Sequence, residues 1–119
     1  MNEEIIPLFP VPVHISKYEK DLTKEQNFIK GISYVPNGTN GNFKSVNTFL
    51  LHSEELKELN KFILSQLNIY TKTIMLSKDT LIPTISWTNK NPKGSRHHQH
   101  IHPNSIVSGV FYFSINDSA

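Results

Sequence analysis

The 119 residues suffice for one domain with a modest core, and 12 Lys and Arg residues against 10 Asp and Glu residues leave a formal charge of +2. This near balance, with the basic residues scattered along the chain, argues against nucleic acid as a partner. Because the chain has no cysteine, disulfide bonds and thiolate metal sites are excluded, and any metal must be held by His, Asp or Glu side chains.

The N-terminal third is predicted to contain an edge strand, a short helix and a loop. Residues 5–16 are rich in residues that favour strands, but three prolines lack the backbone N–H that a strand donates to its neighbour, which favours an edge position. Asp21 can cap a helix over residues 22–30, and Gly31 can end it. Residues 36–42, PNGTNGN, are dense in turn formers and predict a loop. The acidic start and these prolines are unlike a signal peptide, and no apolar run could cross a bilayer, so a cytoplasmic protein without a membrane partner is expected.

A longer amphipathic helix is predicted to start at Ser53. Ser53 can cap it, and the acidic Glu54 and Glu55 suit the positive end of the helix dipole. Apolar residues then recur with a period of 3.6. This pattern predicts one helix of about twenty residues with an apolar face formed by Leu56, Leu59, Ile63, Leu67, Tyr70 and Ile74.

The pattern changes to a period of two after this helix. Ile85 and Trp87 alternate with polar residues, as in a half-buried strand, and residues 91–94, NPKG, predict a turn. A second alternating run over residues 106–115 places Phe111 and Phe113 on one face. Helices followed by antiparallel strands predict an α+β fold in which the helices buttress one side of a sheet or barrel.

Four of the six histidines lie within residues 97–102. On a strand, His98, His100 and His102 would project from one face about 6.6–7 Å apart, and His97 would point the other way. Neutral imidazole suits iron, zinc, copper and nickel, so the paired histidines predict half of a metal site. On this register, loss of His97 should hardly affect metal binding. A solvated surface loop is the alternative interpretation.

Trp87-Thr88-Asn89, the turn and the run HIHPNSIVSGVFYF at residues 100–113 resemble the central motif of a family of 2-oxoglutarate- and Fe(II)-dependent oxygenases of bacteria and their phages. The N-terminal IPLFPVPV and the Asn- and Gly-rich loop are similar to the opening of that family. The resemblance implies N-terminal helices buttressing a double-stranded β-helix, or jelly-roll barrel. It also implies an enzyme that couples decarboxylation of 2-oxoglutarate to the oxidation of a substrate by O₂.

When the family's motif is matched to this sequence position by position, the resemblance implies that His100 is the first Fe(II) ligand. It also places His102 where the wider superfamily has a carboxylate. His98 is left undecided between an orienting role and solvent. Tyr112 matches the tyrosine that holds 2-oxoglutarate in related enzymes, although it could equally fill the barrel. The substrate is not encoded in any of these residues.

Two features of this family are missing from the printed chain. No histidine follows His102, so there is no distal ligand, and no Lys or Arg follows Arg96 to pair with the far carboxylate of 2-oxoglutarate. We therefore expect residues 1–119 to be a single domain, the N-terminal portion of a jelly-roll domain only partly contained in the chain. Alone, this portion should be inactive and should associate through the open edge of its last strand, for example as a homodimer.

Two other interpretations stay open. Gly94, five residues and then His100-Ile101-His102 match the beginning of the cupin signature, but Ile106 and Val107 stand where its glutamate is required. A cupin-type metal-binding barrel would have almost the same fold with different chemistry. The chain could also be a non-catalytic phage or bacterial binding module that retains the barrel. Dependence of turnover on 2-oxoglutarate separates the oxygenase from the cupin interpretation.

Overall fold

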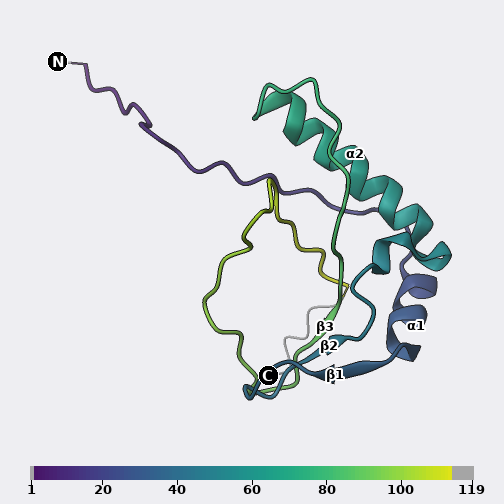
Figure 1. Cartoon of the computed structure of the whole chain (residues 1–119). Coiled ribbons are helices and arrows are strands. Elements are labelled where there is room, and N and C mark those ends of the chain that lie inside the picture. Colours follow the sequence, from purple (N-terminus) through teal and green to yellow (C-terminus); the bar gives the residue numbers. More distant parts are fainter. Residues whose placement is uncertain (1, 114–119) are drawn as a thin grey trace.

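The computed structural model describes residues 2–113, which form an α+β arrangement of two helices and a three-stranded antiparallel sheet (Figure 1). The elements in chain order are α1 (Thr23–Gly31), β1 (Tyr34–Pro36), β2 (Phe43–Ser45), the 3₁₀ turns η1 (Leu50–His52) and η2 (Glu54–Leu56), α2 (Lys57–Thr73) and β3 (Asn89–Lys90). Neither helix of this described part has the length and apolar character needed to cross a bilayer.

The short first helix lies within one residue of its predicted position. The Oδ1 atom of Asp21 accepts hydrogen bonds from the backbone N–H of Thr23 at 3.2 Å and from its hydroxyl at 2.8 Å. These bonds hold the pKa of Asp21 below its usual range. The predicted cap was wrong by one residue, because α1 starts at Thr23 with Leu22 at its N-cap, and Gly31 is its last residue. Asp21 contacts the first turn through Thr23 instead.

The second predicted helix is divided into two parts. Ser53 has an extended backbone with φ −71° and ψ 139° and makes no side-chain cap, so the chain forms η1 and η2 before α2 begins at Lys57. The predicted apolar face is confirmed at Leu56 and Leu59, which are 2% and 1% exposed. Ile74 follows the end of α2 and is largely exposed, so the prediction was wrong for that residue.

The sheet has the order β1-β2-β3. Tyr34 pairs with Ser45 in the first antiparallel ladder, and Lys44 pairs with Asn89 in the second. The predicted loop of residues 36–42 joins β1 to β2, and the Asn37 N–H donates to the Asn42 carbonyl oxygen at 2.9 Å. The sheet thus brings this loop and the end of β3 to neighbouring positions.

The predicted strands at the two ends of the chain are wrong for the described residues. Residues 5–16 form no strand, since their prolines remove ladder donors. They belong to an extended arm whose N-terminal end points away from the helices (Figure 1). Nearer to α1 the arm contacts α2, where His14 Nε2 lies 2.9 Å from the Gln66 side-chain oxygen. Residues 91–113 form a wide loop after β3 without strand pairing. The barrel implied by the resemblance is not present in residues 2–113.

The strand predicted around Trp87 is reduced to β3 and one bridge, and its faces are reversed. Ile85 and Trp87 are exposed by 60% and 39%, whereas Ser86 and Thr88 turn inward. The reason is hydrogen bonding: the Ser86 N–H donates to the Thr48 carbonyl oxygen at 2.8 Å, and the Ser86 hydroxyl accepts from the Leu51 N–H at 2.9 Å. These bonds to neighbouring backbone outweigh the apolar pattern.

The core is small and lies between the helices and the C-terminal loop. Its buried apolar residues are Leu50, Leu56 and Leu59. Phe111 and Phe113 pack against it, and the side-chain amide of Gln26 donates to the Phe113 carbonyl oxygen at 2.9 Å. The Cα radius of gyration is 17.2 Å, against about 13.5 Å for a compact domain of this length. The excess reflects the extended arm and the wide loop.

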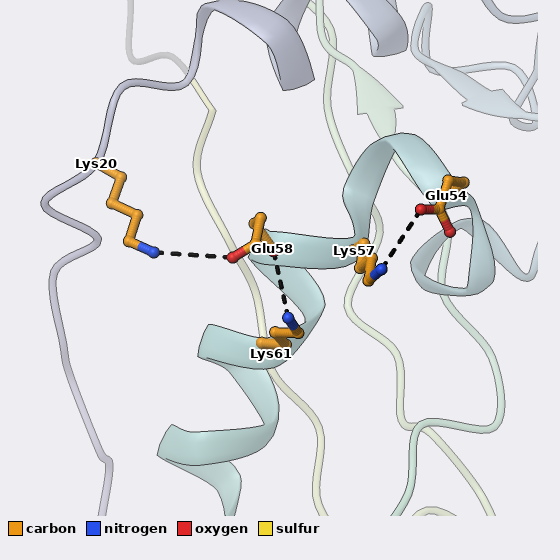
Figure 2. A network of polar contacts seen from close by, with 5 residues as sticks. All are labelled: Lys20, Glu54, Lys57, Glu58 and Lys61. Atoms are coloured by element: carbon orange, nitrogen blue, oxygen red, sulfur yellow. Dashed lines mark hydrogen bonds and ion pairs between the residues drawn. The ribbon is translucent and has the colours of Figure 1, made fainter.

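One ion pair, Lys20–Glu58, links the segment before α1 to α2, and two more lie within η2 and α2 (Figure 2). The carboxylate of Glu58 lies 3.8 Å from the ammonium of Lys20 and 3.3 Å from that of Lys61, and Lys57 lies 3.6 Å from Glu54. The hydrogen bond from Lys61, together with its charge, holds the pKa of Glu58 below its ordinary value. All of these side chains are exposed, so each pair contributes little to stability on its own.

Candidate metal centre

The histidine segment starts directly after a tight turn that follows β3. Gly94 has a φ of +83°, which an L side chain adopts only with strain, and the Ser95 N–H donates to the Pro92 carbonyl oxygen at 3.0 Å. The Arg96 N–H then donates to the Asn40 carbonyl oxygen at 3.2 Å. The turn therefore directs the chain against the loop between β1 and β2, and the histidines follow from that contact.

Three of the imidazoles lie next to one another. The ring centroids of His98 and His100 are 5.1 Å apart, and those of His100 and His102 are 4.8 Å apart. The strand that was expected to hold them is absent, yet the alternate residues remain neighbours, all exposed. Within residues 2–113 no three His, Asp or Glu side chains have converged into an arrangement that could hold a metal ion.

His100 has one ring nitrogen engaged with the backbone. Its Nδ1 atom lies 2.8 Å from the carbonyl oxygen of His98, and since a carbonyl only accepts, Nδ1 carries the proton. In the neutral tautomer with this proton, Nε2 presents its lone pair to the surroundings. This is the arrangement typical of metal-ligating histidine, which donates its other N–H to a carbonyl or carboxylate. The contact holds the His100 ring against the His98 backbone.

His102 lies between the other imidazoles and the only tryptophan of the chain. Its ring centroid is 5.9 Å from that of Trp87, with the planes tilted by 45°. Its carbonyl oxygen accepts from the Ser105 N–H at 3.3 Å, closing a turn in which Asn104 has a φ of 65°. Asparagine tolerates this left-handed conformation better than most residues. The turn and Trp87 hold the far end of the histidine segment.

His97 belongs to a different set of contacts. The Nδ2 atom of Asn42 lies 2.9 Å from its Nδ1 and 3.1 Å from its Nε2, and the Oδ1 atom of Asn91 lies 2.8 Å from Nε2. One tautomer satisfies both partners: Nε2–H donates to Asn91, and Nδ1 accepts from Asn42. The sequence pattern missed Asn42 and Asn91, because each stands in a run of turn formers and was assigned only to a turn.

Among the described residues, no hydrogen bond or ring contact joins Tyr112, His14 or His52 to the imidazole cluster. Tyr112 is 69% exposed and alternates with Phe111 and Phe113, which face the core. It is therefore on the face of this segment that points away from the core. His14 makes a single contact, with the Gln66 side-chain oxygen at 2.9 Å, and the His52 ring lies 6.3 Å from that of Phe49.

Comparison with known proteins agrees with the resemblance for the C-terminal part of the chain. A family model described as "Putative 2OG-Fe(II) oxygenase" matches residues 85–119, which include Trp87, all four clustered histidines and Tyr112. No curated protein and no solved structure is similar to the chain at a significant level. Over residues 85–119, the chain is therefore similar to the 2OG-Fe(II) oxygenase family.

Proposed function

We propose that this chain supplies two iron ligands, His100 and His102, of a 2-oxoglutarate- and Fe(II)-dependent oxygenase. The observation that carries the proposal is the hydrogen bond between His100 Nδ1 and the His98 carbonyl oxygen, 2.8 Å long. It fixes the tautomer whose Nε2 can bind a metal. The family match over residues 85–119 supports the reaction class.

The residues fit two of the ligands that such a centre needs. Imidazole nitrogen suits Fe(II), and His100 and His102 have ring centroids 4.8 Å apart on exposed side chains. An imidazole at His102, in place of a carboxylate, leaves the centre with one more positive charge. With 2-oxoglutarate bound, Fe(II) supplies activation of O₂, and oxidation of the substrate is coupled to decarboxylation.

The side chains around these ligands would orient them and limit access of water. Trp87 stacks obliquely beside His102 and restricts the positions of that ring. The His98 carbonyl holds the plane of the His100 ring through Nδ1. We assign to Tyr112 the role of donating a hydrogen bond from its hydroxyl to a carboxylate of 2-oxoglutarate. That role needs the exposed face of the 106–113 segment to turn toward the centre.

The proposed activity also requires a third protein ligand and a cation for the far carboxylate of 2-oxoglutarate. The stretch after His102 contains no His, Lys or Arg. We propose that both groups come from residues outside the printed sequence. Together with them, residues 1–119 would form the N-terminal portion of one cytoplasmic jelly-roll domain, with β1–β3 and the helices along one side.

Titration of the complete protein with Co(II), followed by calorimetry, tests the assignment. His100→Ala and His102→Ala should each abolish tight binding, whereas His52→Ala, which removes an exposed imidazole elsewhere, should leave it unchanged. The iron-loaded protein should also form succinate from 2-oxoglutarate under O₂. Tight Co(II) binding by both ligand variants would contradict the site. Metal binding without any effect of 2-oxoglutarate would favour a cupin-like barrel instead.

A further inference from the structure

We propose that His97, together with Asn42 and Asn91, is a clamp that positions the histidine segment, so that His97 is a positioning residue although it binds no metal. The inference rests on the proposed function for its effect on metal affinity. It differs from the expectation drawn from strand register alone, in which His97 hardly matters. The clamp is defined by the three side chains His97, Asn42 and Asn91.

The first observation is the burial of Asn42. Its side chain is 2% exposed, and the hydrogen bond from Nδ2 to His97, 2.9 Å long, reaches the start of the histidine segment from a residue 55 positions earlier. A buried amide that loses its partner carries the full cost of desolvation. Asn42 therefore favours the one conformation of the segment in which His97 reaches it.

The second observation is that the backbone supports the same contact. The Arg96 N–H donates to the Asn40 carbonyl oxygen at 3.2 Å, next to the clamp. Gly41 has a φ of +82°, and a Cβ atom built on it would lie 3.7 Å from the Cβ of Ser95. Residues 95–97 thus pass closely over residues 40–42, and Asn91 holds the opposite side of the His97 ring.

The third observation is how few other contacts hold the imidazoles. His98, His100 and His102 are all exposed, and their described contacts are with one another, with Trp87 and within the turn at Ser105. The clamp immediately precedes His98, and the Trp87–His102 contact lies at the other end. Fixing both ends of a short segment restricts the arrangements of the rings between them, which lowers the entropy lost when they converge on a metal.

Metal affinity of the complete protein is one test, with Co(II) as the probe. His97→Ala should weaken binding by about 10-fold, the size of effect that groups orienting a ligand have, while His100→Ala abolishes it. His97→Gln retains an acceptor and a donor and should restore most of the affinity. Gln99→Ala, an exposed neighbour, is the matched control and should bind like the wild type.

Trypsin cleavage of the metal-free protein tests the clamp without reference to function. Asn42→Ala leaves the Arg96–His97 peptide bond and its neighbours unaltered, yet it should speed cleavage after Arg96 at least about threefold, because the segment opens more often. Asn40→Ala removes an exposed side chain from the same loop and should have no effect. Cleavage after Lys61, within α2, should stay slow in both variants, which distinguishes local opening from global unfolding.

The two tests separate the two proposals. Unchanged cleavage after Arg96 in Asn42→Ala would overturn the clamp, and so would wild-type Co(II) affinity in His97→Ala. If the wild type bound no Co(II) while Asn42→Ala still accelerated cleavage, the proposed function would fail and the clamp would stand. Equal losses of Co(II) affinity in His97→Ala and His97→Gln would also count against it, because the hydrogen bonds would then not be the cause.

Discussion

Ser45 and Thr88 are joined by two hydrogen bonds that attach the chain entering β3 to the end of β2. The Ser45 N–H donates to the Thr88 carbonyl oxygen at 2.9 Å, and the Thr88 N–H donates to the Ser45 hydroxyl oxygen at 3.1 Å. The same hydroxyl donates to the Asn47 carbonyl oxygen at 2.8 Å, and Ser45 is fully buried. One small side chain thus satisfies backbone groups of two segments and places Trp87 beside the histidine loop.

Replacing Ser45 by alanine should therefore destabilise the fold by about 1–3 kcal/mol, the cost of leaving a buried backbone group without its partner. Urea unfolding followed by circular dichroism gives the free energy of unfolding. Ser65→Ala is the matched control, because that hydroxyl is exposed and bonds only within α2, to the Phe62 carbonyl oxygen. Equal stabilities of the two variants would show that the Ser45 hydroxyl does not hold β3 in place.

The helices could be predicted from sequence because their signals are local. Asp21 orders the first turn of α1 through its contacts with Thr23, and the spacing of Leu56 and Leu59 identifies the buried face around α2. The break at Ser53 could not be predicted from local signals, since the turn η1 that precedes it is hydrogen-bonded to Ser86, 35 positions after Leu51. Local patterns do not encode such distant hydrogen bonds.

Less of the strands and of the candidate site could be predicted from the sequence than of the helices. Alternation correctly put Phe111 and Phe113 on one face, but these residues pack on the core instead of being exposed at a strand edge. Strand formation requires a backbone partner, and the described residues give residues 106–113 none. The proximity of His98, His100 and His102 followed from their spacing, whereas the contacts of His97 with Asn42 depend on the loop between β1 and β2.

The small core predicts a large effect of a single truncation. Leu59 is 1% exposed on α2, so Leu59→Ala should cost about 2–5 kcal/mol through lost burial and the cavity left behind. Ile69→Ala on the same helix removes a side chain that is 44% exposed and should cost much less. Thermal unfolding of both variants compares the two sites. A similar loss of melting temperature for each would mean that α2 packs through a different face.

The ion pairs around Glu58 predict a dependence of stability on pH. The Lys61 hydrogen bond and charge, followed by the charges of Lys20 and Lys57, lower the folded pKa of Glu58 below its ordinary value of 4.5. A depressed folded pKa stabilises the protein above pH 4.5, and this contribution disappears as the pH falls through the folded value. Glu58→Gln should therefore lower the melting temperature at neutral pH, and the difference from wild type should shrink as the pH falls below 4.5 and through the folded pKa of Glu58.

Salt and a neighbouring carboxylate serve as controls for this effect. Because the groups are exposed, about 0.5 M NaCl should reduce the neutral-pH difference between wild type and Glu58→Gln. Glu55→Gln should lower the melting temperature at neutral pH less than Glu58→Gln does, since the described residues contain no ion pair to Glu55. A difference for Glu58→Gln that stayed the same size throughout the acid titration would assign the effect to packing instead of charge.

Trp87 should report metal binding directly. It is the only tryptophan, and its ring centroid lies 5.9 Å from that of His102. Co(II) has a partly filled d shell and quenches a nearby indole, whereas Zn(II) has a filled shell and does not quench by that route. We therefore expect Co(II) to reduce the Trp87 fluorescence of the complete protein, and excess Zn(II) to displace it and restore the signal. His102→Ala should abolish the quenching, while His52→Ala should retain it. Undiminished quenching in His102→Ala would place the bound metal elsewhere and contradict the assignment of His102 as a ligand.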